Sequence, residues 1–138
     1  MADYAVIGLG KFGYFVAKFL ADLGQNVVAV DSDDEKVRDV KSFVSKSVTA
    51  DAKMPGVLQK LDVRKMHAVL VCFDESLGES VIITHILSQL SVRNIICVVA
   101  NEEHEEVLQK MGATEIIFPH RQAAFSLVQS LSDSYREE

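Results

Sequence analysis

A glycine-rich turn between two apolar runs constrains this chain more than any other feature. The segment Tyr4–Gly13 has the sequence YAVIGLGKFG, in which an apolar run leads into three glycines at the spacing GxGxxG. A second apolar run, Asn26–Val30, ends at Asp31, which follows Gly13 by 18 residues. A strand, a glycine turn, a helix, a second strand and then an acid are typical of a site for an adenine nucleotide or dinucleotide.

Each glycine of the turn has its own expected role. Gly8 allows a sharp turn, Gly10 allows a phosphate to approach the backbone, and Gly13 allows the helix to pack closely on the strand. The unpaired amides of the first helical turn and the positive end of the helix dipole favour an anion there. The expected phosphate site comprises Gly8, Leu9, Gly10, Lys11, Phe12 and Gly13.

Asp31 is expected to accept hydrogen bonds from the ribose hydroxyls of the ligand, with Ser32 beside it. The next residues, Asp33, Asp34 and Glu35, are acidic and would repel a 2′-phosphate, so a free ribose hydroxyl is favoured over NADP. The alternative is a glycine turn without a ligand, in which Asp31 only caps the next helix. Ser32 or Asp33 could fill that capping role equally well.

Composition limits the possible classes of protein. A length of 138 residues, of which 49% are hydrophobic, predicts one domain with a real core. A net charge of −6 argues against a nucleic-acid partner, and no apolar run is long enough to insert into a membrane. The N-terminus does not resemble a signal peptide, because glycine and lysine interrupt its apolar part. Cys72 and Cys97 lie in apolar runs and are expected in the core rather than in a disulfide or metal site.

Hydrophobic periodicity predicts alternating strands and helices. The predicted strands are Tyr4–Ile7, Asn26–Val30, Ser47–Ala50, Ala68–Phe73, Asn94–Val99 and Glu115–Phe118. The predicted helices are Phe12–Leu23, Asp33–Phe43, Gly56–Leu61, Leu77–Leu90, Glu102–Met111 and Ala123–Leu131. Strands that are apolar on both faces predict a Rossmann-type α/β fold, with a doubly wound parallel sheet in the order 3-2-1-4-5-6. The ligand is then expected at the carboxyl ends of strands one, two and four.

The chain offers no recognisable catalytic constellation. His67 precedes strand four at the far end of the sheet, while His85 and His104 lie in predicted helices. His120 follows strand six, on the side of the ligand, but no acid accompanies it at a catalytic spacing. A binding or sensing domain is therefore favoured over an enzyme.

Several segments together resemble the KTN or RCK N-terminal nucleotide-binding domain of Ktr- and Trk-type potassium-transport regulators, and most of all the Ktr-type regulatory subunit. The resemblance covers nearly the whole chain, and the order of the motifs is specific. The segments are Tyr4–Gly13, Val28–Asp31, Thr49–Ala52, Ala68–Val71, Val107–Pro119 and Ala124–Ser132.

The resemblance implies an adenine nucleotide ligand, either ATP/ADP or NAD/NADH. Asp51 and Ala52 would lie beside the adenine, although Asp51 could instead cap a helix before Met54. Lys11 stands where many relatives have an arginine that reaches a terminal phosphate; by itself it would be interpreted as an exposed lysine at a helix start. Asp74 would face the site, where the family often has glycine.

The implied function is that of a cytoplasmic regulatory subunit, without enzymatic activity, that gates a membrane potassium channel or transporter. Rearrangement of a homodimer or larger ring would carry the signal. Residues 1–119 would form the nucleotide-binding domain, and residues 120–138 a crossover and dimerisation helix with a polar tail. The alternatives are the NAD-binding fragment of an oxidoreductase and a stand-alone NAD redox sensor.

Two features near the C-terminus refine this expectation. After Pro119 the chain continues as His120-Arg-Gln, where some relatives have an acid that binds a divalent cation, so a carboxylate metal site is not expected. The last predicted helix carries an apolar stripe that we expect to pack on a second subunit, the alternative being that it covers the sheet edge. The stripe consists of Phe125, Leu127, Val128 and Leu131.

Overall fold

The computed structural model describes residues 3–73 and 76–136. Six strands form one parallel sheet in the order β3-β2-β1-β4-β5-β6, which confirms the predicted Rossmann-type topology. The strands are β1 (Asp3–Ile7), β2 (Asn26–Asp31), β3 (Lys46–Thr49), β4 (Ala68–Val71), β5 (Ile95–Val98) and β6 (Glu115–Ile117).

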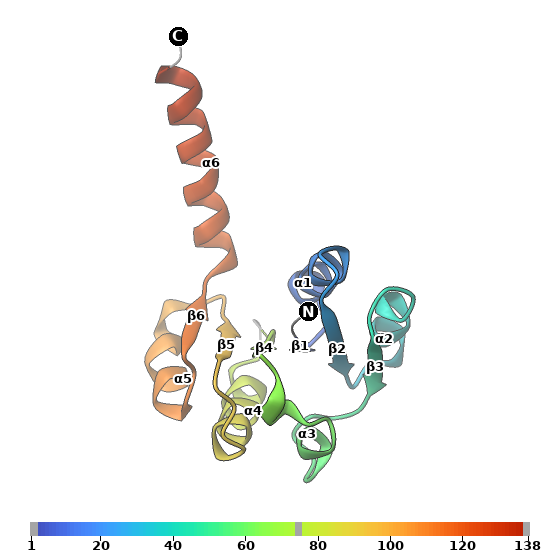
Figure 1. Ribbon diagram of the computed structural model, residues 1–138. Coiled ribbons are helices and arrows are strands. Elements are labelled where there is room, and N and C mark those ends of the chain that lie inside the picture. The colour runs from blue at the N-terminus through green and yellow to red at the C-terminus, as the bar shows by residue number, and fades with distance from the viewer. Residues whose placement is uncertain (1–2, 74–75, 137–138) are drawn as a thin grey trace.

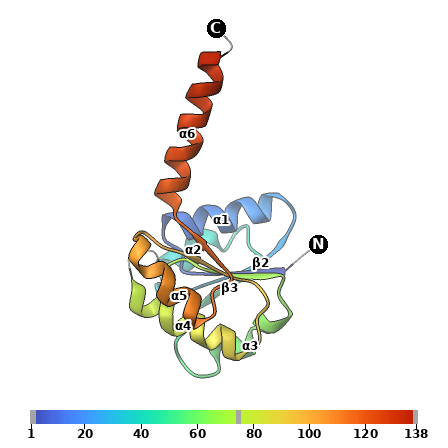
Figure 2. The same ribbon diagram turned by 90° about the vertical axis from the view of Figure 1, so that its left-hand side faces the viewer.

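Helices cover both faces of the sheet, and the last helix projects away from it (Figures 1 and 2). One face carries α1 and α2, and the other carries α3, α4 and α5. The helices are α1 (Lys11–Asp22), α2 (Asp34–Val40), α3 (Val57–Lys60), α4 (Leu77–Gln89), α5 (Glu105–Met111) and α6 (Pro119–Arg136). Two short 3₁₀ helices, η1 (Val63–Lys65) and η2 (Glu102–His104), complete the connections.

Two apolar clusters form the core, one on each face of the sheet. Alternate residues of one strand serve different clusters: Ala5 and Ile7 pack toward α3, α4 and α5, whereas Val6 packs toward α1 and α2. Because side chains alternate along a strand, a sheet covered on both faces needs apolar residues at successive positions. The strands of this chain meet that requirement.

Several element boundaries differ from the prediction. The second helix ends at Val40 rather than Phe43, because the chain turns there to enter β3. The predicted helix 102–111 is split into η2 and α5. The last helix already begins at Pro119, a residue type suited to the first helical position, and it runs to Arg136. The proposed division of the chain after residue 119 stays a prediction.

The apolar stripe of α1 faces only partly inward. Phe12, Val16 and Leu20 pack against the core, but Phe19 is 61% exposed and Leu23, just after the helix, is 74% exposed. The fully buried positions of α1 are the small residues Gly13 and Ala17. Small residues let the helix axis approach the sheet, and the bulky side chains are then left outside. The apolar residues of this helix therefore do not form one stripe against the core.

Both cysteines are buried in the core, as predicted. The Cys97 thiol lies 3.1 Å from the Thr84 hydroxyl, and its burial raises its pKa above the ordinary value. In the described part of the chain, no helix has both the length and the apolar character needed to cross a membrane.

Replacement of Gly13 by alanine is expected to destabilise the protein by roughly 3 kcal/mol, because the added methyl group would overpack the turn. The new Cβ would lie 1.9 Å from the carbonyl oxygen of Gly8. The matched control is Gly10→Ala: Gly10 has a φ of −65°, and its Cβ would meet no atom within 4 Å. Urea unfolding followed by circular dichroism compares the two variants. Equal losses of stability would contradict this account of the turn.

Candidate nucleotide-binding site

A cleft of about 750 Å³ opens at the carboxyl ends of the central strands. This is the edge where a sheet of this topology binds its ligands. The expected residues Gly8 to Phe12, Asp31 and Ser32 line it. The other residues that line it are Phe15, Asp33, Lys36, Cys72, Phe73, Ser76, Glu79, Pro119 and His120.

The glycine turn is held between two strands. Gly8 donates its N–H to the Val30 carbonyl at 2.9 Å, and Cys72 donates its N–H to the Ile7 carbonyl at 2.8 Å. Gly8 has a φ of +97°, and a Cβ there would lie 2.8 Å from the Cys72 carbonyl oxygen, so both conformation and space require glycine. The turn is therefore fixed before any ligand arrives.

Asp31 connects the end of β2 to the glycine turn. Its Oδ2 accepts the Leu9 N–H at 2.8 Å, and its Oδ1 accepts the Asp33 N–H at 2.8 Å. The residue is only 7% exposed, so these two bonds compensate much of the cost of burying a carboxylate. A carboxylate has about four acceptor positions, which leaves capacity for ribose hydroxyls. Asp31 does not cap α2; Asp33 does, by accepting the Glu35 N–H at 3.0 Å.

The N-terminus of α1 is prepared for an anion. Its N-cap, Gly10, provides no side-chain acceptor, and the first turn contains no acidic residue. Lys11 instead places a positive charge at the positive end of the helix dipole, an unfavourable arrangement unless an anion binds there. In contrast, α2 begins with Asp34 and Glu35. The free amides at the start of α1 therefore lie at the cleft without an acidic side chain in the first turn.

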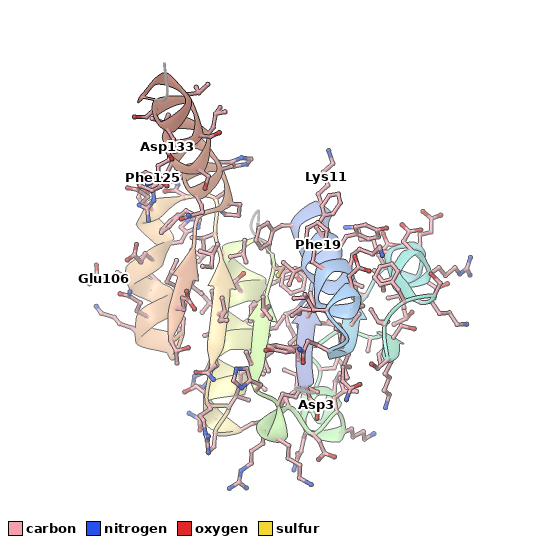
Figure 3. The ribbon with its side chains drawn as sticks, turned by 45° about the horizontal axis from the view of Figure 1, so that its top comes forward. Asp3, Lys11, Phe19, Glu106, Phe125 and Asp133 are labelled. Atoms are coloured by element: carbon pink, nitrogen blue, oxygen red, sulfur yellow. The ribbon has the colours of Figure 1, made fainter. Side chains whose placement is uncertain are left out.

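The first turn of α6 forms part of the cleft wall, through Pro119 and His120. Arg121 holds this turn in place: its guanidinium pairs with Glu102 at 2.8 Å and lies 4.1 Å from the Phe118 ring centroid. The cleft therefore extends from the glycine turn to the base of the projecting helix. In Figure 3, Lys11 and Phe125 lie toward the same end of the molecule.

Asp51 and Ala52 line a smaller hollow that adjoins the cleft and shares Asp31, Ser32, Phe73 and Glu79 with it. The Lys53 N–H donates to Asp51 at 2.9 Å and holds the pKa of that carboxyl below its ordinary value. No helix starts at Met54, so Asp51 caps a turn, not a helix. Its placement beside an adenine stays a prediction. Asp74 lies outside the described residues.

The charges near the expected ribose differ from the predicted row of repelling carboxylates. Asp34 pairs with Arg38 at 2.7 Å and accepts the Thr49 hydroxyl at 2.9 Å. Of the three acids after Ser32, only Asp33 lines the cleft, and Lys36 lines it too. The preference against NADP therefore depends on Asp31 and Asp33, with one lysine opposing them, and it stays a prediction.

The expected site did not include nine residues of the cleft wall: Phe15, Asp33, Lys36, Cys72, Phe73, Ser76, Glu79, Pro119 and His120. Phe73 could have been found, because it follows β4 at the expected edge. Phe15, Lys36 and Glu79 lie on helices, and their direction depends on how each helix rotates against the sheet. Among the described residues, no group of three or more His, Cys, Asp or Glu side chains could hold a metal ion.

This chain is similar in sequence to a known domain family and to characterised proteins. Residues 4–119 match the TrkA-N domain family. The chain is 38% identical over 122 residues to the Ktr system potassium uptake protein C of Bacillus subtilis (strain 168), an alignment that covers 88% of this chain and 55% of that protein. It is 37% identical over 131 residues to the Ktr system potassium uptake protein A of the same strain, covering 95% and 59%. The chain thus spans little more than half the length of these relatives.

Solved structures share the fold at lower identity. The NAD(P)-binding domain of an exopolyphosphatase-related protein from Archaeoglobus fulgidus has a TM-score of 0.80, with 23% identity and full coverage of both chains. The GsuK channel bound to NAD has a TM-score of 0.75, with 18% identity over 84% of this chain and 21% of that one. GsuK bound to ADP has a TM-score of 0.74, with 18% identity, covering 85% and 31%.

The substitution Asp31→Asn is expected to destabilise the unliganded protein by about 1–3 kcal/mol, because one of two backbone N–H groups loses its buried acceptor. Those groups are the amides of Leu9 and Asp33. Asp33→Asn is the matched control, since asparagine caps a helix as well as aspartate does. Thermal unfolding without ligand measures both. An Asp31→Asn variant as stable as the control would show that the carboxylate does not hold the turn.

Proposed function

Because the chain belongs to the TrkA-N domain family, we propose that it is the nucleotide-sensing part of a regulatory subunit for potassium transport. Its ligand is an adenine nucleotide, ATP/ADP or NAD/NADH, bound at the carboxyl edge of the sheet. Its partner is an integral-membrane potassium channel or transporter, which it contacts from the cytoplasm. The two Ktr relatives, named potassium uptake proteins, support this proposal.

The observation that carries the proposal is that Asp31 and the start of α1, whose N-cap has no side-chain acceptor, line the same cleft. The amide end of α1 is suited to phosphate, and the buried carboxylate of Asp31, held by Leu9, is suited to ribose hydroxyls. Gly10 adds to this argument, because its backbone angles and surroundings would accept a side chain. The space in front of Gly10 therefore serves something other than the fold, and we assign it to the phosphates.

These contacts do not distinguish ATP or ADP from NAD or NADH, because all four ligands contain adenosine diphosphate. The fold neighbour GsuK has been solved with NAD and with ADP. Lys11, exposed at the mouth of the cleft, favours a ligand with a free terminal phosphate. Asp51 and Ala52, beside Asp31, are assigned to the base.

The route from the cleft to a partner is α6. Its first turn lines the cleft. Residues 120–133 are all exposed, on every side of the helix. The large apolar side chains left in solvent concentrate on α1 and its C-cap (Phe15, Phe19 and Leu23) and on α6 (Phe125, Leu127, Val128 and Leu131). Because α6 does not cover the sheet of its own chain, we propose that its apolar stripe packs on a second copy.

The size of a gating signal also favours an assembly. Switching a gate from 1:99 to 99:1 takes roughly 5.5 kcal/mol of differential binding. One allosteric site commonly supplies about 1–3 kcal/mol, so several identical sites acting on one gate reach the total. A homodimer or larger ring, in which each α6 is displaced by the ligand of its own cleft, meets this requirement. Binding alone is sufficient for this function, and no catalytic step is assigned.

Titration calorimetry with ATP, ADP, NAD and NADH tests the ligand assignment. Gly10→Ala is expected to raise the Kd of every bound ligand at least tenfold by obstructing the phosphates, while Lys11→Ala raises that of ATP more than that of NAD. Lys41→Ala, an exposed lysine outside the cleft, is the control. The absence of heat with all four compounds at millimolar concentration would refute the proposed function. If Lys11→Ala raises the Kd of ATP and of NAD equally, the proposed contact between Lys11 and a terminal phosphate is wrong.

Sedimentation velocity tests the assembly. Leu127→Asp combined with Leu131→Asp is expected to shift the protein toward monomers at micromolar concentration, because both side chains are about 60% exposed in the single chain and would be buried between copies. Ser126→Asp changes the opposite side of α6 and should leave the assembly intact. If wild type and the double variant sediment identically, α6 is not the contact between copies.

A further inference from the structure

A second hollow, of about 530 Å³, lies at the amino edge of the sheet. Asp3 begins β1, His67 precedes β4, and Asn94 precedes β5, so three parallel strands start around it. This is the edge opposite to the cleft, and Figure 3 shows Asp3 and Lys11 at opposite ends of the molecule. The hollow is therefore independent of the nucleotide site. We call it the basic pocket, defined by Arg64, Lys65, His67 and Arg93.

Positive charge gathers in the basic pocket although the chain as a whole carries −6. Two loops supply it: Arg64 and Lys65 belong to η1, and Arg93 precedes β5. Within the described parts of the chain, the ion pairs involve Lys18, Arg38, Lys53, Lys110 and Arg121, and none of the three pocket cations. Two arginines and a lysine around one hollow repel one another. An anion would relieve this repulsion.

One carboxylate, Asp3, also lines the hollow, but it is already engaged. Its Oδ1 accepts a hydrogen bond from the Asn26 side-chain amide at 2.8 Å. That bond links the starts of β1 and β2, and Asp3 forms none of the recorded ion pairs in the described residues. Its single charge leaves an excess of positive charge from two arginines and a lysine.

Hydrogen bonds fix the two cationic loops relative to each other. The Asn94 side-chain amide donates to the His67 carbonyl at 2.7 Å, and the Val69 N–H donates to the Asn94 carbonyl at 2.9 Å. The His67 N–H in turn donates to the Asp3 carbonyl at 2.8 Å. The backbone that carries the cations is thus ordered in advance, which lowers the entropic cost of binding.

From these observations we propose that the basic pocket binds a phosphate group. Guanidinium groups match phosphate oxygens in pairs, and a neighbouring ammonium adds a point charge, so two arginines and a lysine suit a phosphate with more than one negative charge. A nucleic acid is not favoured, because the cations occupy one hollow on an acidic chain rather than an extended basic stripe. The phosphate could belong to a lipid headgroup or to a soluble molecule.

Nuclear magnetic resonance of the ¹⁵N-labelled chain, titrated with sodium pyrophosphate, tests the proposal residue by residue. We expect saturable shifts in the amide signals of Arg64–His67, Arg93 and Asn94, separate from any at the glycine turn. The double variant Arg64→Glu/Arg93→Glu should weaken this response at least tenfold. Lys41→Glu/Lys46→Glu carries the same change of net charge on exposed residues outside the pocket and should keep it. If the double variant does not fold, Arg93→Gln replaces it.

Vesicle co-sedimentation separates the two sources of phosphate. Vesicles of phosphatidylcholine with phosphatidylglycerol are compared with phosphatidylcholine alone. Binding to the anionic vesicles that is lost in Arg64→Glu/Arg93→Glu but kept in the control assigns the pocket to a headgroup. Pyrophosphate shifts at the pocket without vesicle binding assign it to a soluble phosphate. Pyrophosphate shifts confined to the glycine turn, or equal responses of both double variants, would overturn the proposal.

Discussion

The hydrogen bond from the Leu9 amide to the Asp31 carboxylate is the contact on which the cleft depends. It joins residues 22 positions apart in the sequence and closes the glycine turn against the end of β2. The same carboxylate also accepts the Asp33 amide, so it orders the loop that leads into α2. One buried charge thus serves the fold and, in our proposal, the ligand. A ligand hydroxyl would meet an acceptor that needs no rearrangement, which favours binding.

The cleft and the projecting helix share residues, so no other element is needed to connect them. Pro119 and His120 belong both to the cleft wall and to the first turn of α6. In our proposal, a ligand in the cleft would act directly on the base of this 18-residue helix. The exposed stripe on that helix has no partner within the described chain, so its position is free to be set by a second copy. We therefore propose a sensor, whose ligand would change the position of this exposed surface and would need no reacting group.

Charge is distributed differently at the two edges of the sheet. At the carboxyl edge, two lysines and the free amides of α1 share the cleft with three acids, Asp31, Asp33 and Glu79. This mixed set suits a ligand with phosphates at one end and hydroxyls at the other. At the amino edge, the cations of the basic pocket face a single engaged acid. Parallel topology produces this separation, because every strand start and every strand end gathers at its own edge.

The topology of the sheet and the residues at the centre of the candidate site could be predicted from the sequence alone. Strands apolar on both faces admit few arrangements other than a covered parallel sheet, and the glycine spacing with Asp31 is local enough to be recognised in one chain. The outer walls of the cleft became apparent only in the folded chain. The rotation of helices against the sheet turned Lys36 and Glu79 toward the cleft and left Phe19 in solvent, and the pairing of Asp34 with Arg38 and Thr49 removed an expected charge from the ribose side. The rotation of a helix and the pairing of a side chain depend on contacts between elements that lie far apart in the sequence. A local sequence pattern therefore does not predict them.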